Sequence, residues 1–189
     1  MNATVDLSGV CLETDRLILR EWKETDLDDL FEYASVDGVG QMAGWQPHKS
    51  LSDARFVLKM FIDGKKTFAL ELKENHKVIG SLGLENMSSE IEGYTEDLIG
   101  REIGYVLSKD YWGRGIMPEA VKAVISYCFE KLHCDYLICS CSPENPQSAR
   151  VIEKSGFRFV MEKSRSLRDG SVRTARYHLL DNPARVSDN

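Results

Sequence analysis

The part of this 189-residue chain best suited to chemistry is a glycine-bearing turn, Trp112-Gly113-Arg114-Gly115. Strand-forming residues precede the turn, and Pro118 follows it at a position suited to the first residue of a helix. A strand, turn and helix in this order present backbone N–H groups and the positive end of a helix dipole to an anion. Glycine also lets a phosphate approach the backbone without meeting a Cβ atom. The turn is therefore either a phosphate site or a tight connection that binds nothing.

Other common ligand motifs are absent from the sequence. No Gly-Lys-Ser/Thr follows the turn, so a P-loop is excluded, and there is no dinucleotide fingerprint. The four histidines do not stand at metal-ligand spacing from one another or from a cysteine pair, so we expect no metal. The five cysteines contain no CxxC pair and are predicted to be buried, reduced thiols.

Composition limits the class of protein. Hydrophobic residues make up 42% and charged residues 29%, which predicts one globular domain over residues 1–189, with its core at about residues 12–181. The net charge of -6 argues against a nucleic-acid partner and favours a cationic substrate. Apolar runs are too short to span a bilayer, and the first residues lack a signal-peptide pattern, so we expect a cytoplasmic protein without a membrane partner.

The elements that must position the turn follow from hydrophobic periodicity and turn residues. Strands are predicted at 16–20, 67–72, 77–84, 99–108, 136–142, 157–167 and 172–180. Helices are predicted at 27–35, from about 52, through 121–132, and at 147–154. The apolar side of the second helix is expected to carry Phe56 and Met60, with Leu51 and Phe61 as further candidates. We expect Gly156 as a left-handed cap and Asp169-Gly170 as a tight hairpin turn.

Several stretches in order resemble the landmarks of the GNAT acetyltransferases. They are Tyr111-Trp112-Gly113-Arg114-Gly115, Pro118-Glu119-Ala120-Val121, Asn145-Pro146-Gln147-Ser148 and Glu153-Lys154-Ser155-Gly156-Phe157. Two further stretches resemble the branch that acetylates ribosomal-protein alanine and serine N-termini: residues 14–20 and Glu102-Ile103-Gly104-Tyr105. Together these stretches extend over nearly the whole chain.

The resemblance implies a fold and an activity. The fold is α+β, with a GNAT-type central mixed, mostly antiparallel sheet of about seven strands and helices on both faces. The activity is transfer of an acetyl group from acetyl-CoA to a primary amine by direct attack, and the expected acceptor is a protein N-terminal amine. Rival functions are acetylation of a small amine (polyamine, amino sugar or antibiotic), a non-catalytic acyl-CoA-binding module and a purely structural domain. The expected assembly is a monomer or a homodimer.

The resemblance also implies which residues hold the co-substrate. Backbone groups of Tyr105 and Leu107 would hold the pantetheine arm and thioester, and Asn145 and Ser148 would line the pantetheine end. The pyrophosphate would lie against Gly113, Arg114, Gly115, Ile116 and Met117. Family members often carry Gln or Arg in place of Trp112, and Gly or Ala in place of Met117, so Met117 is expected to add bulk near the pyrophosphate.

The predicted catalytic residues are Glu102 as general base, directly or through water, and Ser148 as proton donor to the leaving thiolate. The alternatives are that Glu102 is a structural partner of Arg101 or of a neighbouring strand, and that Ser148 is an ordinary first-turn residue. Glu85 is a second candidate base. Tyr111 and Tyr136 are alternative proton donors, and Cys139 and Cys141 define a covalent route that we do not favour.

The acceptor pocket is expected at residues 31–45 and at the final hairpin. The acidic run from Glu90 to Asp97 is either an attractive surface for a basic acceptor or a solvated loop. Trp22 and Trp45 either flank the acceptor or belong to the core.

Overall fold

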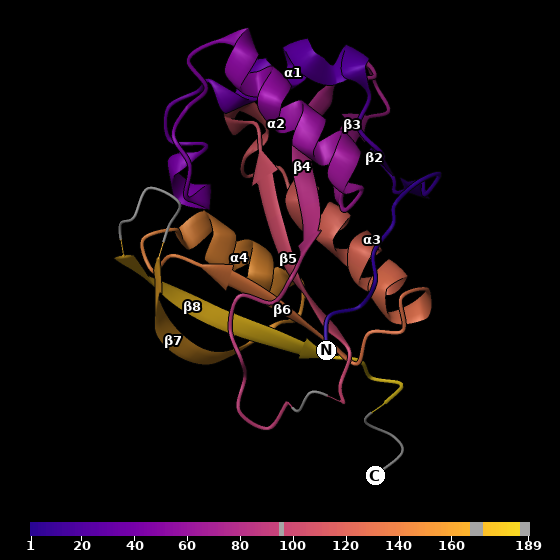
Figure 1. The fold of residues 1–189 in the computed structure, drawn as a ribbon, viewed down its shortest axis with the longest axis vertical. Helices are drawn as coiled ribbons and strands as arrows, with labels where there is room; N and C mark the ends of the chain where they lie inside the picture. Colours follow the sequence, from indigo (N-terminus) through magenta and orange to yellow (C-terminus); the bar gives the residue numbers. More distant parts are fainter. Residues whose placement is uncertain (95–96, 167–171, 186–189) are drawn as a thin grey trace. The chain divides into compact units, whose positions relative to one another are not determined.

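A computed structural model describes residues 1–94, 97–166 and 172–185 (Figure 1). The chain divides into two compact units. We call residues 6–83 and 105–120 the N-terminal unit, and residues 1–5, 84–104 and 121–189 the C-terminal unit. The expectation that residues 1–189 form one domain stays a prediction.

The N-terminal unit contains four strands in the order β1-β2-β3-β4. Each neighbouring pair is antiparallel. The bounds are Leu12–Glu13 for β1, Leu17–Arg20 for β2, Thr67–Leu72 for β3 and Val78–Glu85 for β4, whose last two residues belong to the C-terminal unit. The end of β5 (Gly100–Leu107) also lies in this unit, where the N–H of Ser108 donates to the carbonyl oxygen of Ile79 at 2.7 Å.

Helices α1 (Leu27–Ala34) and α2 (Leu51–Gly64) lie side by side in this unit (Figure 1). The prediction that Phe56 and Met60 form the apolar side of α2 is wrong, because both side chains are exposed, as is Leu51. Phe61 does pack against the core. The buried side carries Ala54 and Leu58, with Val57, Phe61 and Ile62 packed beside them. Helix α2 has apolar residues on more than one side, and only packing against α1 and the sheet selects the buried one.

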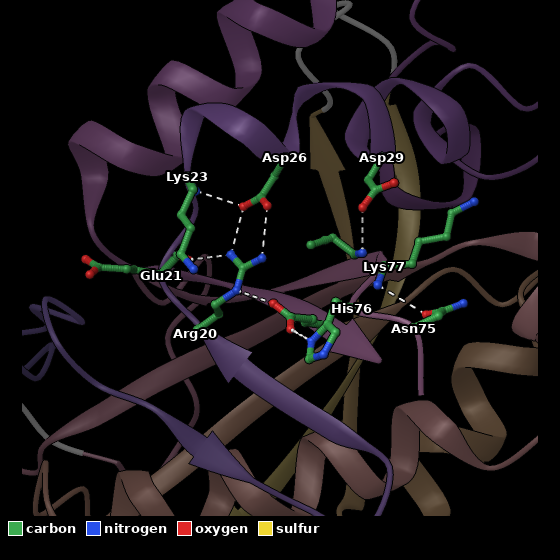
Figure 2. Close-up of polar contacts among 10 residues, drawn as sticks. Arg20, Glu21, Lys23, Asp26, Asp29, Asn75, His76 and Lys77 are labelled. Atoms are coloured by element: carbon green, nitrogen blue, oxygen red, sulfur yellow. Dashed lines mark hydrogen bonds and ion pairs between the residues drawn. The ribbon is translucent and has the colours of Figure 1, made fainter. Parts of the chain in front are cut away.

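A cluster of charged side chains, in which Asp26 and Glu71 are buried and His76 is exposed, joins β2, β3 and the start of α1 (Figure 2). The guanidinium of Arg20 donates to both carboxylate oxygens of Asp26, at 2.8 and 2.9 Å, and to Glu71. Asp26 also accepts from the backbone N–H of Lys23 at 2.8 Å, and Glu71 contacts the ring of His76 at 2.8 Å. We call Arg20, Asp26, Glu71 and His76 the charge cluster. It fixes the point at which the chain leaves the sheet and enters α1.

The C-terminal unit contains the strand order β5-β6-β8-β7. Strand β6 (Tyr136–Cys141) runs parallel to β5, whereas β8 (Val172–Asp181) runs antiparallel to β6 and to β7 (Arg158–Ser166). Helix α3 (Ile116–Glu130) begins in the N-terminal unit, and α4 (Pro146–Lys154) lies wholly in the C-terminal unit. One core cluster of this unit contains Ile91, Tyr136, Ile138, Ala175, Tyr177 and Leu179.

The predicted α+β class with a mixed, mostly antiparallel sheet is confirmed. The described residues form eight strands where about seven were expected, because the two-residue β1 is too short to show a hydrophobic pattern. Gly156 has φ +90°, which confirms the left-handed cap. The predicted Asp169-Gly170 turn lies outside the described residues.

The cysteine prediction needs one correction. Four cysteines are buried and reduced as expected, but Cys11 is exposed because it lies just before the edge strand β1. No helix within the described residues is both long enough and apolar enough to cross a bilayer.

Candidate active site

The glycine turn lies between the short 3-10 helix η3 (Lys109–Tyr111) and the start of α3 at Ile116. Gly113 and Gly115 have φ values of +75° and +73°, a region that L-residues rarely adopt. A Cβ atom at Gly113 would meet nothing within 4 Å, so glycine is required by the backbone conformation and not by crowding. The turn is exposed at the amino end of a 15-residue helix, a setting that fits an anion.

The prediction that Pro118 is the first helical residue is wrong by two positions, because α3 begins at Ile116. Pro118 is still within the first turn of the helix, where a backbone N–H has no intrahelical acceptor. The proline therefore remains compatible with the helix start.

The side chains of Trp112 and Arg16 hold the turn by hydrogen bonds to backbone carbonyls, one just before the turn and one within it. The indole N–H of Trp112 donates to the carbonyl oxygen of Leu107 at 2.8 Å, and Nη1 of Arg16 donates to the carbonyl oxygen of Arg114 at 2.9 Å. Trp112 also packs against the core that contains Trp22 and Leu30. An aromatic residue at position 112 thus fixes the entry to the turn by packing and by a hydrogen bond.

Glu119 connects this turn to the segment before β2. Its Oε1 accepts from the hydroxyl of Thr14 at 2.6 Å and from the backbone N–H of Arg16 at 2.9 Å. Its Oε2 accepts from Nε of Arg16 at 2.7 Å and lies 2.6 Å from Nη2. We call Thr14, Arg16 and Glu119 the turn clamp. All three residues stand within motifs of the sequence, but nothing in the sequence connects them, because a separation of 103 residues between Arg16 and Glu119 leaves no local signal.

The remaining residues expected around the pyrophosphate differ in exposure. Ile116 and Met117 are buried, whereas Gly113, Arg114 and Gly115 are exposed. The bulk of Met117 is therefore inside the protein and does not cover the exposed turn. Backbone groups are what the turn presents.

Tyr105 and Leu107 lie on the part of β5 that belongs to the N-terminal unit. Tyr105 is half-buried and Leu107 is buried. The structure therefore places all the predicted thioester and pyrophosphate residues, from Tyr105 to Met117, in one unit with the turn clamp.

Glu102 lies in the C-terminal unit and is buried, at 5% exposure. Its Oε2 accepts from the backbone N–H and the hydroxyl of Ser88, at 2.9 and 2.6 Å, and its Oε1 accepts from the hydroxyl of Ser140 at 2.7 Å. Ser88 and Ser140 were not predictable as partners of Glu102, because serines in a loop and a strand carry no distinctive pattern. Three donors therefore hold this carboxylate in a defined orientation.

Arg101, the expected structural partner of Glu102, donates to the carbonyl oxygens of Ala3 and Leu84 and to the side chain of Asn86. Burial lowers the pKa of Arg101. The contacts of Arg101 tie the first residues of the chain to β4, while those of Glu102 reach β6 through Ser140.

Asn145 and Ser148 meet at the start of α4. Oδ1 of Asn145 accepts from the backbone N–H of Ser148 at 3.0 Å, so Asn145 is the N-cap of this helix. Ser148 is the third helical residue and is half-buried. The Asn-x-x-Ser spacing thus has a structural reason, and the cap positions the Ser148 side chain at the first turn.

The other candidate groups gain little support. Burial raises the pKa values of Tyr136 and Cys141, which disfavours a thiolate nucleophile at position 141. The hydroxyl of Tyr136 contacts the sulfur of Met87 at 3.0 Å. Trp22 belongs to the core, where it packs on Phe61 with ring centroids 5.2 Å apart.

A comparison with protein families now decides the family. The acetyltransferase (GNAT) domain matches residues 16–158, a range that contains the turn, Glu102, Asn145 and Ser148. The chain belongs to the GNAT acetyltransferases. It is an acetyl-CoA-dependent N-acetyltransferase whose second substrate is an amine.

Individual relatives agree with this assignment. The uncharacterized N-acetyltransferase p20 of Bacillus licheniformis is 32% identical over 163 residues, covering 84% of this chain and 85% of that protein. A GNAT-family acetyltransferase from Bacillus anthracis has a similar fold, with a TM-score of 0.78, 23% identity and coverage of 92% of this chain and 99% of that chain. A putative ribosomal-protein-serine acetyltransferase from Vibrio cholerae gives a TM-score of 0.75 at 20% identity, covering 90% of this chain and 97% of that chain.

The exposed glycine turn of this GNAT enzyme fits the diphosphate of acetyl-CoA. Its two glycines adopt a left-handed backbone, open space surrounds the Gly113 position, and the amino end of α3 follows directly. Among the described residues, no group of three His, Cys, Asp or Glu side chains is arranged to hold a metal ion.

Proposed function

We propose that this GNAT enzyme acetylates the N-terminal amines of proteins, as in the ribosomal-protein acetyltransferases. The observation that carries the proposal is the setting of Glu102, whose carboxylate already accepts three hydrogen bonds. Because both oxygens already accept hydrogen bonds, this carboxylate has little room to contact the amine directly, which suits an acceptor that is partly neutral before it binds. An α-amine, with a pKa of about 7.7–8.0, meets this condition better than a lysine amine at about 10.4.

Two further observations support this acceptor class. The stretches 14–20 and 102–105 resemble the ribosomal-protein branch, and the similar Vibrio cholerae structure is described as a putative ribosomal-protein-serine acetyltransferase. A net charge of -6 also favours a basic protein as acceptor.

The proposed reaction is direct transfer. Acetyl-CoA supplies an activated thioester. The backbone N–H of Leu107 stabilises the developing charge on the carbonyl oxygen, and N–H groups from Gly113 to Met117 hold the diphosphate. The amine nitrogen bonds to the carbonyl carbon and the C–S bond breaks. Glu102 receives the amine proton through water, and Ser148 donates a proton to the sulfur and regains one from solvent.

The acceptor class is tested by mass spectrometry of products from a matched set of amines. The set contains peptides with N-terminal serine or alanine, the same peptides with a blocked N-terminus and an internal lysine, spermidine, an amino sugar and an aminoglycoside. We expect acetylation of the α-amine with kcat/KM at least about tenfold above that of the other amines, a difference of about 1.4 kcal/mol. Preference for a small amine would contradict the proposed acceptor.

The catalytic roles are tested by near-isosteric variants. Glu102→Gln keeps the size of the side chain and removes its charge, so we expect kcat to fall by about 100-fold and the acid limb of the pH–rate profile to disappear. Glu85→Gln is the matched control, and it should retain the wild-type kcat and the acid limb of the pH–rate profile. An unchanged pH–rate profile in Glu102→Gln would remove the base assignment.

Ser148→Ala tests proton donation to the thiolate. We expect a lower kcat with an unchanged KM for acetyl-CoA, because the hydroxyl acts as the C–S bond breaks. Gln147→Ala, at the exposed preceding position of α4, is the control. Full turnover by Ser148→Ala would show that another group protonates the sulfur.

A further inference from the structure

The turn clamp joins a charged side chain to the backbone of the glycine turn. Arg16 contacts the carboxylate of Glu119 with Nε and Nη2, and its remaining terminal nitrogen, Nη1, donates to the carbonyl oxygen of Arg114 at 2.9 Å. Glu119 in turn accepts from Thr14 and from the backbone of Arg16. Hydrogen bonds on both carboxylate oxygens of Glu119 thus fix the guanidinium that contacts the turn.

The contact between Arg16 and the carbonyl of Arg114 sets the orientation of the peptide unit that joins Arg114 to Gly115. The peptide unit is planar and trans, so the N–H of Gly115 points opposite to the carbonyl of Arg114. By holding that carbonyl, Arg16 turns the N–H of Gly115 away from the clamp. Glycine has more allowed backbone conformations than any other residue type, and Gly113 and Gly115 both lie at positive φ. Without an external restraint, such a turn would sample many orientations of its N–H groups.

We propose that Arg16 and Glu119 are positioning residues that preorganise the turn for the diphosphate of acetyl-CoA. Arg16 acts through the carbonyl of Arg114, and Glu119 acts by orienting Arg16. The inference rests on the proposed placement of the diphosphate at this turn, and it assigns a role to two side chains that do not belong to the turn itself.

A direct role for Arg16 as a phosphate ligand predicts the opposite response to one substitution. Glu119→Gln removes the negative charge that neutralises Arg16 and leaves the guanidinium in place. If Arg16 bound phosphate directly, this change would leave CoA affinity unchanged or raise it, because the cation would be less compensated. If Glu119 orients Arg16, the same change loosens the turn and lowers CoA affinity.

The first measurement is the dissociation constant of CoA by titration calorimetry for the wild type, Glu119→Gln, Arg16→Met and Arg16→Lys. We expect the dissociation constant of CoA to rise about tenfold in Glu119→Gln and in Arg16→Met, which is equivalent to a loss of about 1.4 kcal/mol of binding free energy. Arg16→Lys keeps the charge but loses the planar fork that contacts Glu119 and Arg114 together, so it should also bind CoA more weakly. Unchanged or tighter CoA binding in Glu119→Gln overturns the clamp.

The second measurement separates positioning of the turn from general damage. Acetyl-pantetheine lacks the diphosphate and the nucleotide, so its turnover should be the same in Glu119→Gln and the wild type, while KM for acetyl-CoA rises. Glu13→Gln is the matched control, because it removes the exposed Lys73–Glu13 ion pair, 2.9 Å long, from the same segment without contacting the turn. If Glu119→Gln lost activity equally with acetyl-CoA and with acetyl-pantetheine, the role of Glu119 would be in folding alone.

The two proposals fail differently. A wild type that shows no heat of CoA binding and no acetyl transfer, although folded, would remove the placement of the diphosphate and with it the basis of the clamp. A wild type that binds CoA at full affinity, together with variants of equal affinity, would remove only the clamp.

Discussion

The N-terminal unit contains two arginine networks that begin four residues apart in the chain. Arg20 belongs to the charge cluster and is paired with two carboxylates, Asp26 and Glu71 (Figure 2). Arg16 belongs to the turn clamp and is paired with one carboxylate and one backbone carbonyl, those of Glu119 and Arg114. The Arg20 side chain is 12% exposed and that of Arg16 is 45% exposed.

The difference shows how one residue type serves two purposes. In the charge cluster Arg20 is paired with Glu71 on β3 and with Asp26 at the start of α1, so the network joins secondary-structure elements. In the turn clamp one partner is the backbone of an exposed turn, so the network orients a loop. Buried ion pairs are costly to break, whereas exposed pairs contribute little to stability. The first network should therefore govern stability and the second should govern ligand affinity.

The largest effect is expected for Arg20→Met. The substitution leaves the carboxylates of Asp26 and Glu71 buried without their cation, which should lower the free energy of unfolding by about 3–5 kcal/mol. Arg16→Met removes a partly exposed pair and should cost about 1 kcal/mol or less. Urea denaturation followed by circular dichroism measures both. Equal losses would mean that the two networks have the same structural role.

The next effect is expected for Gly113→Val. Left-handed backbone costs an L-residue about 1–2 kcal/mol, so the turn should rearrange, and the dissociation constant of CoA should rise at least about tenfold. Gly9→Val is a matched control in the same unit, because Gly9 has φ +70° and also has nothing within 4 Å of its Cβ position. Both variants should lose similar stability, but only Gly113→Val should lose CoA affinity. Unchanged affinity would contradict the placement of the diphosphate.

The smallest effect is expected in acid. Burial by itself would raise the pKa values of Glu71 and Glu119, but the hydrogen bonds that each carboxylate accepts lower them by more. Glu71 accepts from His76 and Arg20, and Glu119 accepts from Thr14 and Arg16. Both pKa values therefore lie below the ordinary 4.5. Carboxylates with lowered pKa values stabilise the folded state above about pH 4.5, and this contribution is lost as pH falls through the folded pKa.

We therefore expect the unfolding free energy to fall less steeply below pH 4.5 in Glu71→Gln and in Glu119→Gln than in the wild type. Urea denaturation at a series of pH values between 7 and 3 measures this slope. Slopes parallel to that of the wild type would show that neither carboxylate is linked to folding.

The parts of the site that were predictable are those with local causes. The turn was identifiable because glycine adopts φ values such as +75° and +73° far more readily than other residues, and because a strand and a helix flank it. Asn145 and Ser148 were identified by the resemblance to the GNAT family, and the structure gives their spacing a local cause, because the N-cap side chain bonds to the third helical residue. The element bounds were close for the same reason, since hydrophobic periodicity is local.

The remaining features required the folded chain. Phe56 and Met60 were assigned to the wrong side of α2, because two apolar stripes compete on that helix and only tertiary packing selects one. The three donors around Glu102 come from a loop and from β6, and no spacing in the sequence predicts their meeting.

By itself, the sequence determined the α+β class, the GNAT motifs and the glycine turn, because these depend on backbone conformation and on short-range spacing. Only the tertiary structure decided which charges meet. It placed Arg16 on Glu119 and Arg20 on Asp26 and Glu71, although the two arginines lie in one short segment and look equivalent in the chain. Ion pairs form between side chains that folding brings together, and folding is directed mainly by burial of apolar surface, which carries no information about the sign of a distant charge.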